Sequence, residues 1–164
     1  MKTQHITRLA IYTAMALALH IFERMIPIPI PFPGVKLGLA NFIIVIVLYK
    51  HGFKDALIVN LARVFLGAIF GGGLSALLYS FSGAMISMIA MALVMNFMKD
   101  SVSSLGVSLT GAYFHSFAQL GVAALIIQNI GIITYLPVIM WASLATGAII
   151  GIVSDEFLKR KLAF

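Results

Sequence analysis

The chain contains no cysteine and has few charged residues. Only 10% of its 164 residues are charged, whereas an ordinary soluble domain has about 25%. Without cysteine there can be no disulfide, no thiol nucleophile and no thiolate metal site. With so few charges the chain could not cover the outside of a water-soluble globule, and its 62% hydrophobic content excludes disorder. An embedded membrane protein is the class that remains.

Clustered acids and nucleotide-binding motifs are also absent from the sequence. The five acidic residues fall at the ends of apolar runs, whereas magnesium-dependent diphosphate chemistry uses grouped carboxylates. The four histidines are scattered without the spacing of metal ligands. No glycine-rich phosphate loop ending in lysine and serine or threonine is present. We therefore expect no catalytic residue, no metal, no cofactor and no ATP hydrolysis by this chain.

Six apolar runs account for most of the chain. A helix that crosses a bilayer takes about 20 residues, so six would use about 120 and leave only loops and tails. The sequence predicts an all-α integral membrane protein, a bundle of six transmembrane helices forming a single domain over residues 1–164. The runs are Leu9–Phe22, Leu37–Tyr49, Ala56–Phe70, Leu74–Met98, Leu105–Ile130 and Tyr135–Leu158.

The basic residues lie between the apolar runs. The net charge of +6 could suit nucleic acid, but these residues are not gathered into a stripe, so we expect no nucleic-acid partner. With the N-terminus in the cytoplasm, only Arg24 and Lys36 face outward, and Arg63 lies within a run. The positive-inside rule then predicts a multi-pass protein with both termini cytoplasmic. The residues placed inside are Lys2, Arg8, Lys50, Lys54, Lys99, Lys159, Arg160 and Lys161.

The first 18 residues allow a second interpretation. Met1–Ala18 has a basic start, an apolar stretch and Ala16-x-Ala18, which is the pattern of a secretory signal. Cleavage there would leave five runs and an external N-terminus. All six runs fit the charge bias, which favours the uncleaved form.

Proline dominates the segment between the first two runs. In Ile26–Gly34 four prolines alternate with apolar residues. Proline lacks the amide proton and restrains the preceding residue to extended geometry. We expect a stiff, extended connector on the external side.

Small residues form two stripes at helical spacing. Ala10, Ala14 and Ala18 recur every four residues, and such a stripe lets helix backbones approach closely. It either packs against a neighbouring span or docks another protein on an outer face. We interpret a similar stripe in the sixth run, Ser143, Gly147 and Gly151, as internal packing.

The third run contains a buried-charge candidate. Asn60, Arg63 and Gly67 share one helix face. A charge at mid-bilayer costs about 2.5–3.5 kcal/mol, so Arg63 should face the bundle interior. It caps helix carbonyls, pairs with Glu23, or receives an anionic or carbonyl-rich ligand through its planar donor fork.

Further polar residues lie inside the other runs. Ser108, Gly111, His115 and Gln119 form a stripe in the fifth run. His115 and Gln119 hydrogen-bond either a ligand, or each other and a neighbouring span. Ligand sites are mostly apolar with a few convergent polar groups, so one pocket beneath the connector is a reasonable hypothesis. Its candidate residues are Lys36, Asn41, Asn60, Arg63, His115 and Gln119.

Three parts of the chain resemble a small bacterial family that is labelled both Gx transporter and heptaprenyl diphosphate synthase component I. This family is similar to the substrate-binding (S) components of energy-coupling factor (ECF) vitamin transporters. The resemblance implies a six-helix protein of the bacterial cell membrane with a long external loop over its pocket. The matching parts are Lys36-Leu-Gly-Leu-Ala-Asn41, Arg63 with Leu66-Gly67, and His115 with Gln119.

The resemblance also implies partners. In the ECF type an Ala-x-x-x-Ala motif of the first helix packs on a transmembrane coupling subunit that joins two ATPases. Ala10, Ala14 and Ala18 become the expected docking stripe, the connector becomes the pocket lid, and a small molecule becomes the substrate. Two alternatives remain: a non-catalytic partner of a polyprenyl diphosphate synthase or electron-transfer system, and a self-sufficient channel or exchanger.

Overall fold

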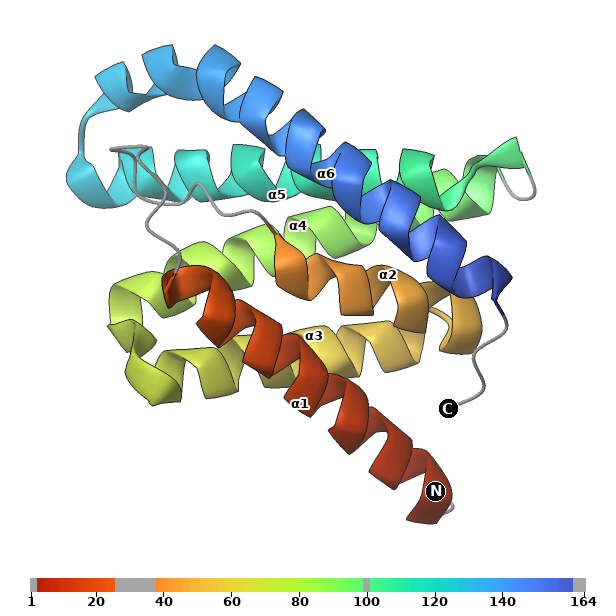
Figure 1. Ribbon diagram of the computed structural model, residues 1–164. Helices are drawn as coiled ribbons and strands as arrows, with labels where there is room; N and C mark the ends of the chain where they lie inside the picture. The colour runs from red at the N-terminus through yellow and green to blue at the C-terminus, as the bar shows by residue number, and fades with distance from the viewer. Residues whose placement is uncertain (1–2, 26–37, 99–100, 161–164) are drawn as a thin grey trace.

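The computed structural model describes residues 3–25, 38–98 and 101–160. These residues form six α-helices and no strand (Figure 1), which confirms the all-α prediction. A π-helical turn (η1, Ala68–Gly72) leads into α4, and a 3-10 turn (η3, Ile130–Tyr135) precedes α6. The helices are α1 (Thr3–Met25), α2 (Leu39–His51), α3 (Phe53–Gly67), α4 (Gly73–Met98), α5 (Ser104–Ile127) and α6 (Leu136–Lys159).

Helix length separates α2 from the long helices. By length and composition α1, α4, α5 and α6 are able to cross a membrane. The 15 residues of α3 continue into the 5 residues of η1 without a break. α2 has only 13 residues, about 20 Å of helix against about 30 Å of hydrocarbon. The predicted run Leu37–Tyr49 is therefore too short to be a complete span by itself.

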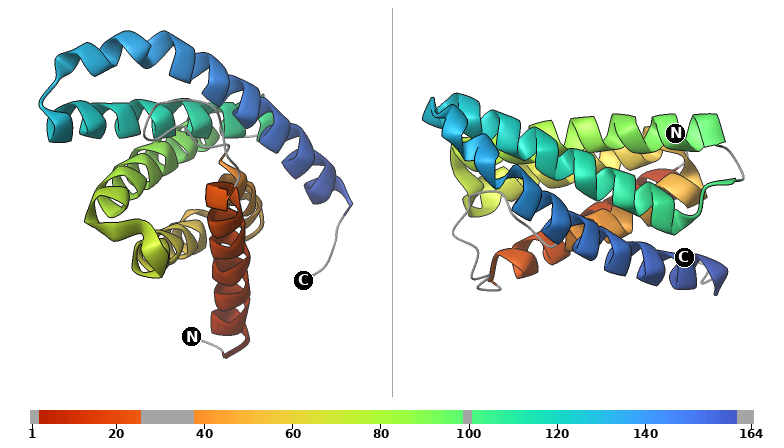
Figure 2. Two further views of the ribbon diagram at one scale, coloured as in Figure 1. Left: turned by 60° about the vertical axis from the view of Figure 1, so that its left-hand side comes forward. Right: turned by 90° about the horizontal axis from the view of Figure 1, so that it is seen from above.

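α2 lies at the centre of the bundle. Every residue from Ile43 to Leu48 is at most 3% exposed, which is why this helix is apolar on all its faces. The other helices surround it in the order α1, α3, α4, α5, α6, each contacting the next. Within the described residues α6 and α1 make no contact, so the ring is open between them (Figure 2).

Successive helices run in opposite directions, which brings the start of α1 and the end of α6 to one side of the bundle (Figure 1). We call this side, with Thr3, the turn at Gly52 and Lys159, the basal end, and the opposite side the distal end. Gly52 alone joins α2 to α3, with φ 84°, a conformation that favours glycine. Of the described lysine and arginine side chains, all but Arg63 lie toward the basal end: Arg8, Lys50, Lys54, Lys159 and Arg160.

Small residues bring α5 and α6 together. A Cβ on Gly147 would lie 2.7 Å from Cβ of Ala112, and one on Gly151 would lie 2.7 Å from Cα of Leu105. Side chains larger than hydrogen at these positions would separate the two helices. The stripe of Ser143, Gly147 and Gly151 therefore serves internal packing, as predicted.

Candidate functional site

Asn60 and Arg63 form a hydrogen-bonded pair in α3. Both side chains are buried, with 2% and 3% exposed. Nε and Nη2 of Arg63 donate to Oδ1 of Asn60 at 3.2 and 2.5 Å. Nδ2 of Asn60 in turn donates to the carbonyl oxygen of Ala84 in α4, at 3.3 Å. The i,i+3 spacing read from the sequence thus brings these two candidates into direct contact.

Glu23 of α1 supplies a negative charge near Arg63. Its side chain is 4% exposed and interacts electrostatically with the guanidinium. One carboxylate oxygen also accepts the backbone N–H of Gly38, immediately before α2, at 2.5 Å. Of the interpretations offered for Arg63, the arrangement supports pairing with Glu23. It also ties α1, α2 and α3 together near the distal end.

His20 belongs to the same region, and sequence reasoning did not select it. It is 6% exposed and lies against α3, since a Cβ on Gly67 would lie 3.0 Å from His20 Cδ2. A helical spacing pattern that includes His20 could have been recognised in the sequence of the first run and the residue after it. Ala16, His20 and Glu23 recur at intervals of four and three and share the buried face of α1.

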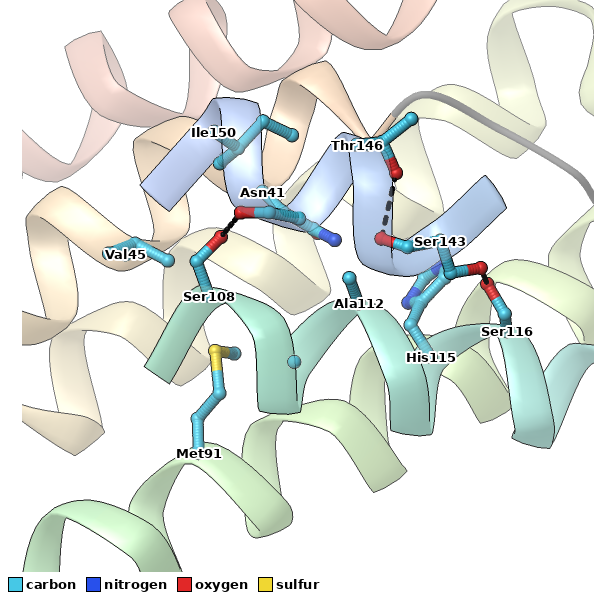
Figure 3. Close-up of a pocket in the computed structure, with 13 residues that line it drawn as sticks. Asn41, Val45, Met91, Ser108, Ala112, His115, Ser116, Ser143, Thr146 and Ile150 are labelled. Carbon is cyan, nitrogen blue, oxygen red and sulfur yellow. Dashed lines mark hydrogen bonds between the residues drawn. The ribbon is translucent and has the colours of Figure 1, made fainter. Parts of the chain in front are cut away.

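A small cavity lies between α2, α4, α5 and α6, and Figure 3 shows Asn41 entering it from α2 and His115 from α5. Its volume is about 20 Å³, room for about one water molecule. Small-molecule sites usually measure about 300–1,000 Å³. The helices would have to separate before this cavity could admit a vitamin-sized molecule.

Most hydroxyl groups that line the cavity already have partners (Figure 3). Ser108 Oγ donates to the carbonyl oxygen of Gly147 at 2.8 Å, and Ser143 Oγ contacts Ser116 Oγ at 2.5 Å. The ring of His115 lies against Gly83 of α4, where an added Cβ would lie 2.7 Å from its Cε1. No three His, Asp or Glu side chains are grouped to hold a metal ion in the part of the chain that the structure describes.

Gln119 is buried without a hydrogen-bond partner. Its side chain is 2% exposed, and among the described residues neither its amide nitrogen nor its amide oxygen has a partner. The alternative in which His115 and Gln119 hydrogen-bond each other is therefore wrong. Gln119 lies one helical turn beyond His115 toward the distal end and does not line the cavity.

The candidates thus form two groups that meet at α4. Asn60 and Arg63 lie on the side of Ala84, whereas His115 lies against the adjacent Gly83 and shares its cavity with Asn41. Lys36 and the connector Ile26–Gly34 lie outside the described residues.

The alanine stripe of α1 faces outward. Ala10, Ala14 and Ala18 are all exposed, and in the described residues α1 contacts only α2 and α3. The stripe therefore does not pack against a neighbouring helix of this chain, which was one of the two alternatives. The opposite face of α1 is buried: Leu9, Tyr12, Thr13, Ala16, His20 and Glu23.

The comparison with protein families gives one result over most of the chain. The family described as heptaprenyl diphosphate synthase component I matches residues 12–157. The matched region runs from the first half of α1 nearly to the end of α6, and it includes the residues of both groups and of the cavity. No curated protein and no solved structure matches the chain.

Proposed function

We propose, on the premise that this chain belongs to the heptaprenyl diphosphate synthase component I family, that it is the substrate-binding (S) component of an ECF-type importer. It takes a vitamin- or cofactor-like molecule from the external side without changing it chemically. It docks on a transmembrane coupling subunit that joins two ATPases. Its place is the bacterial cell membrane, with the basal end and both termini in the cytoplasm. The outward alanine stripe of α1 is the observation that carries this proposal.

Docking through α1 follows from how helices associate in lipid. Lipid tails are as apolar as leucine, so association relies on close van der Waals contact, which small residues permit. Among the four long helices, α1 has the smallest buried share, 22% against 33–39%. Its three alanines lie opposite its buried face. A partner helix can therefore approach the backbone of α1 without disturbing the bundle.

Substrate capture needs the cavity to enlarge. Asn41 lies in the first turn of α2, and Gly38 just before it is held by Glu23 of α1. A shift of Gly38 would move this first turn relative to His115 on α5. We place ligand entry beneath the connector, with Asn41, His115 and Gln119 as the groups that meet the ligand. The unpartnered amide of Gln119 supports this placement.

The test of the docking role replaces all three stripe alanines with leucine. Because Ala10, Ala14 and Ala18 are exposed, the variant should still fold. The larger leucine side chains should prevent close contact between α1 and the partner helix. We expect the amount of co-purified coupling subunit and ATPases to fall by about tenfold or more, which corresponds to ~1.4 kcal/mol.

The control is Ala145→Leu, the same type of substitution made once, at an exposed position of α6. It should leave the complex intact. Equal recovery of the ATPases with the wild-type chain and the triple variant would show that α1 is not the docking helix. If the wild-type chain recovers no ATPase, the proposal that it is part of an importer is wrong.

The family description favours a second function. A component I implies a second component, and the chain would then be the non-catalytic membrane partner of a polyprenyl diphosphate synthase. In that case the same co-purification recovers a soluble synthase instead of ATPases, and deleting the chain changes the length of the prenyl product. A self-sufficient channel or exchanger would differ from both, because it gives flux in liposomes without any ATPase.

A further inference from the structure

An apolar groove lies in the opening between α1 and α6, with a volume of about 180 Å³. Ile43 and Ile46 of α2 form its floor, and each is at most 2% exposed. Ile11 and Met15 of α1, 53% and 43% exposed, form one wall, and Phe157 of α6 lies on the other side. The groove therefore extends from the basal end toward the middle of the bundle.

A positive charge stands at the basal mouth of the groove. Among the described residues that line it, Arg8 alone is charged; it is exposed and forms no ion pair within the described part of the chain. Nζ of Lys50 lies 5.5 Å from the ring centre of Phe157. Lys50 therefore places a second cation beside the mouth of the groove. Nearby acids are engaged with other side chains: Asp55 with His5, Asp155 with Lys159 and Glu156 with Arg160.

We propose that this groove binds one anionic phospholipid of the surrounding membrane. One acyl chain lies along the floor formed by α2, and the phosphate meets the guanidinium of Arg8. From Arg8 to Met15 the helix rises about 10 Å, most of the ~15 Å depth of one hydrocarbon leaflet. The planar donor fork of arginine matches two phosphate oxygens at once. Charge and length thus both fit a lipid whose headgroup lies at the basal surface.

A second apolar depression in the same molecule provides an internal comparison. It lies between α4 and α5, is lined by residues such as Ile89, Leu93 and Phe114, and has a volume of about 390 Å³. None of the described residues that line it is charged. Among the described residues that line these two surfaces, a cation lies at the expected headgroup position in the groove between α1 and α6 and not in the depression between α4 and α5. Selection for an anionic lipid is therefore specific to that groove.

The experiment is native mass spectrometry of the purified full chain with equal amounts of phosphatidylglycerol and phosphatidylcholine. We expect the first retained lipid to be phosphatidylglycerol, by about fivefold over phosphatidylcholine. Arg8→Gln should reduce that preference to about one, whereas Arg8→Lys should keep most of it. Ile11→Trp should lower the retention of both lipids, because the indole fills the groove.

Two control variants leave the groove unchanged. Ile89→Trp alters the depression between α4 and α5, and Arg160→Gln removes a basal cation that pairs with Glu156. Both should behave as the wild-type chain. The proposal is overturned if the wild-type chain shows no preference, if Arg8→Gln keeps the preference, or if a prenyl diphosphate occupies the groove in place of the phospholipid. Because the chain is tested alone, the result is independent of its docking partner.

Discussion

Arg63 illustrates how a charge is held inside an apolar bundle. Its guanidinium donates to Asn60 and lies near the carboxylate of Glu23, and all three side chains are at most 4% exposed. In a buried pair each charge is the main compensation for the other. Removing one partner therefore costs more than removing both, because the remaining charge stays buried without compensation.

This reasoning predicts the outcome of replacing Arg63. Arg63→Met should lower the free energy of unfolding by about 3–5 kcal/mol, measured by circular dichroism in detergent. The double variant Glu23→Gln, Arg63→Met should recover most of that loss. Arg160→Met, at an exposed position, is the control and should change stability by less than about 0.5 kcal/mol. A double variant as unstable as the single one would show that Glu23 is not the counter-charge.

Sequence reasoning at the residue scale succeeds within one helix and fails between helices. The contact between Asn60 and Arg63 follows from their spacing. The partnership of Arg63 with Glu23 could only be offered as one alternative, because spacing within a run says nothing about which helix lies opposite. For the same reason the sequence could not tell that Gln119 is left without a hydrogen-bond partner, whereas His115 lies against Gly83.

At the scale of elements, apolar run lengths predict the long helices well. The predicted run Leu74–Met98 corresponds to α4, Gly73–Met98, and the ends of α5 and α6 lie within three residues of their predicted runs. α1 begins six residues before its predicted run. α2 differs in kind. Its start after Gly38 and its end at Gly52 depend on positive φ angles at these glycines, which hydropathy does not register. A run can therefore be apolar enough for a span and still form a short central helix.

The contact between α5 and α6 predicts a second variant. In Gly147→Ala the new Cβ would lie 2.7 Å from Ala112 Cβ and 3.3 Å from the backbone oxygen of Ser108. The backbone cannot yield without moving the helices apart, so we expect a loss of about 1–3 kcal/mol. Thermal unfolding in detergent measures it.

Gly121→Ala in α5 is the matched control for this change. Nothing lies within 4 Å of the added Cβ at that position, and alanine is favoured over glycine in a helix by about 1 kcal/mol. The control should therefore be neutral or stabilising. Equal stability of the two variants would mean that α5 and α6 are not packed as closely as described.

At the scale of the whole molecule, the open ring assigns two outward surfaces to α1. One is the alanine stripe, and the other is the wall of the groove formed by Ile11 and Met15. The sequence shows the alanine stripe but cannot show that it is exposed. Its exposure depends on which helices contact α1, and among the described residues α6 does not. Neighbour relations of this kind arise from the packing of all six helices together.

The orientation of the whole bundle is the last prediction, and the absence of native cysteine makes it directly measurable. The described lysine side chains, together with those of Arg8 and Arg160, lie toward the basal end, which the positive-inside rule predicts to be cytoplasmic. Single cysteines are introduced as Lys54→Cys at the basal end and Thr134→Cys at the distal end, both exposed. A membrane-impermeable maleimide should label Thr134→Cys in intact cells and Lys54→Cys only after permeabilisation. The reverse pattern would place the connector in the cytoplasm and would exclude substrate entry from the external side through the distal end.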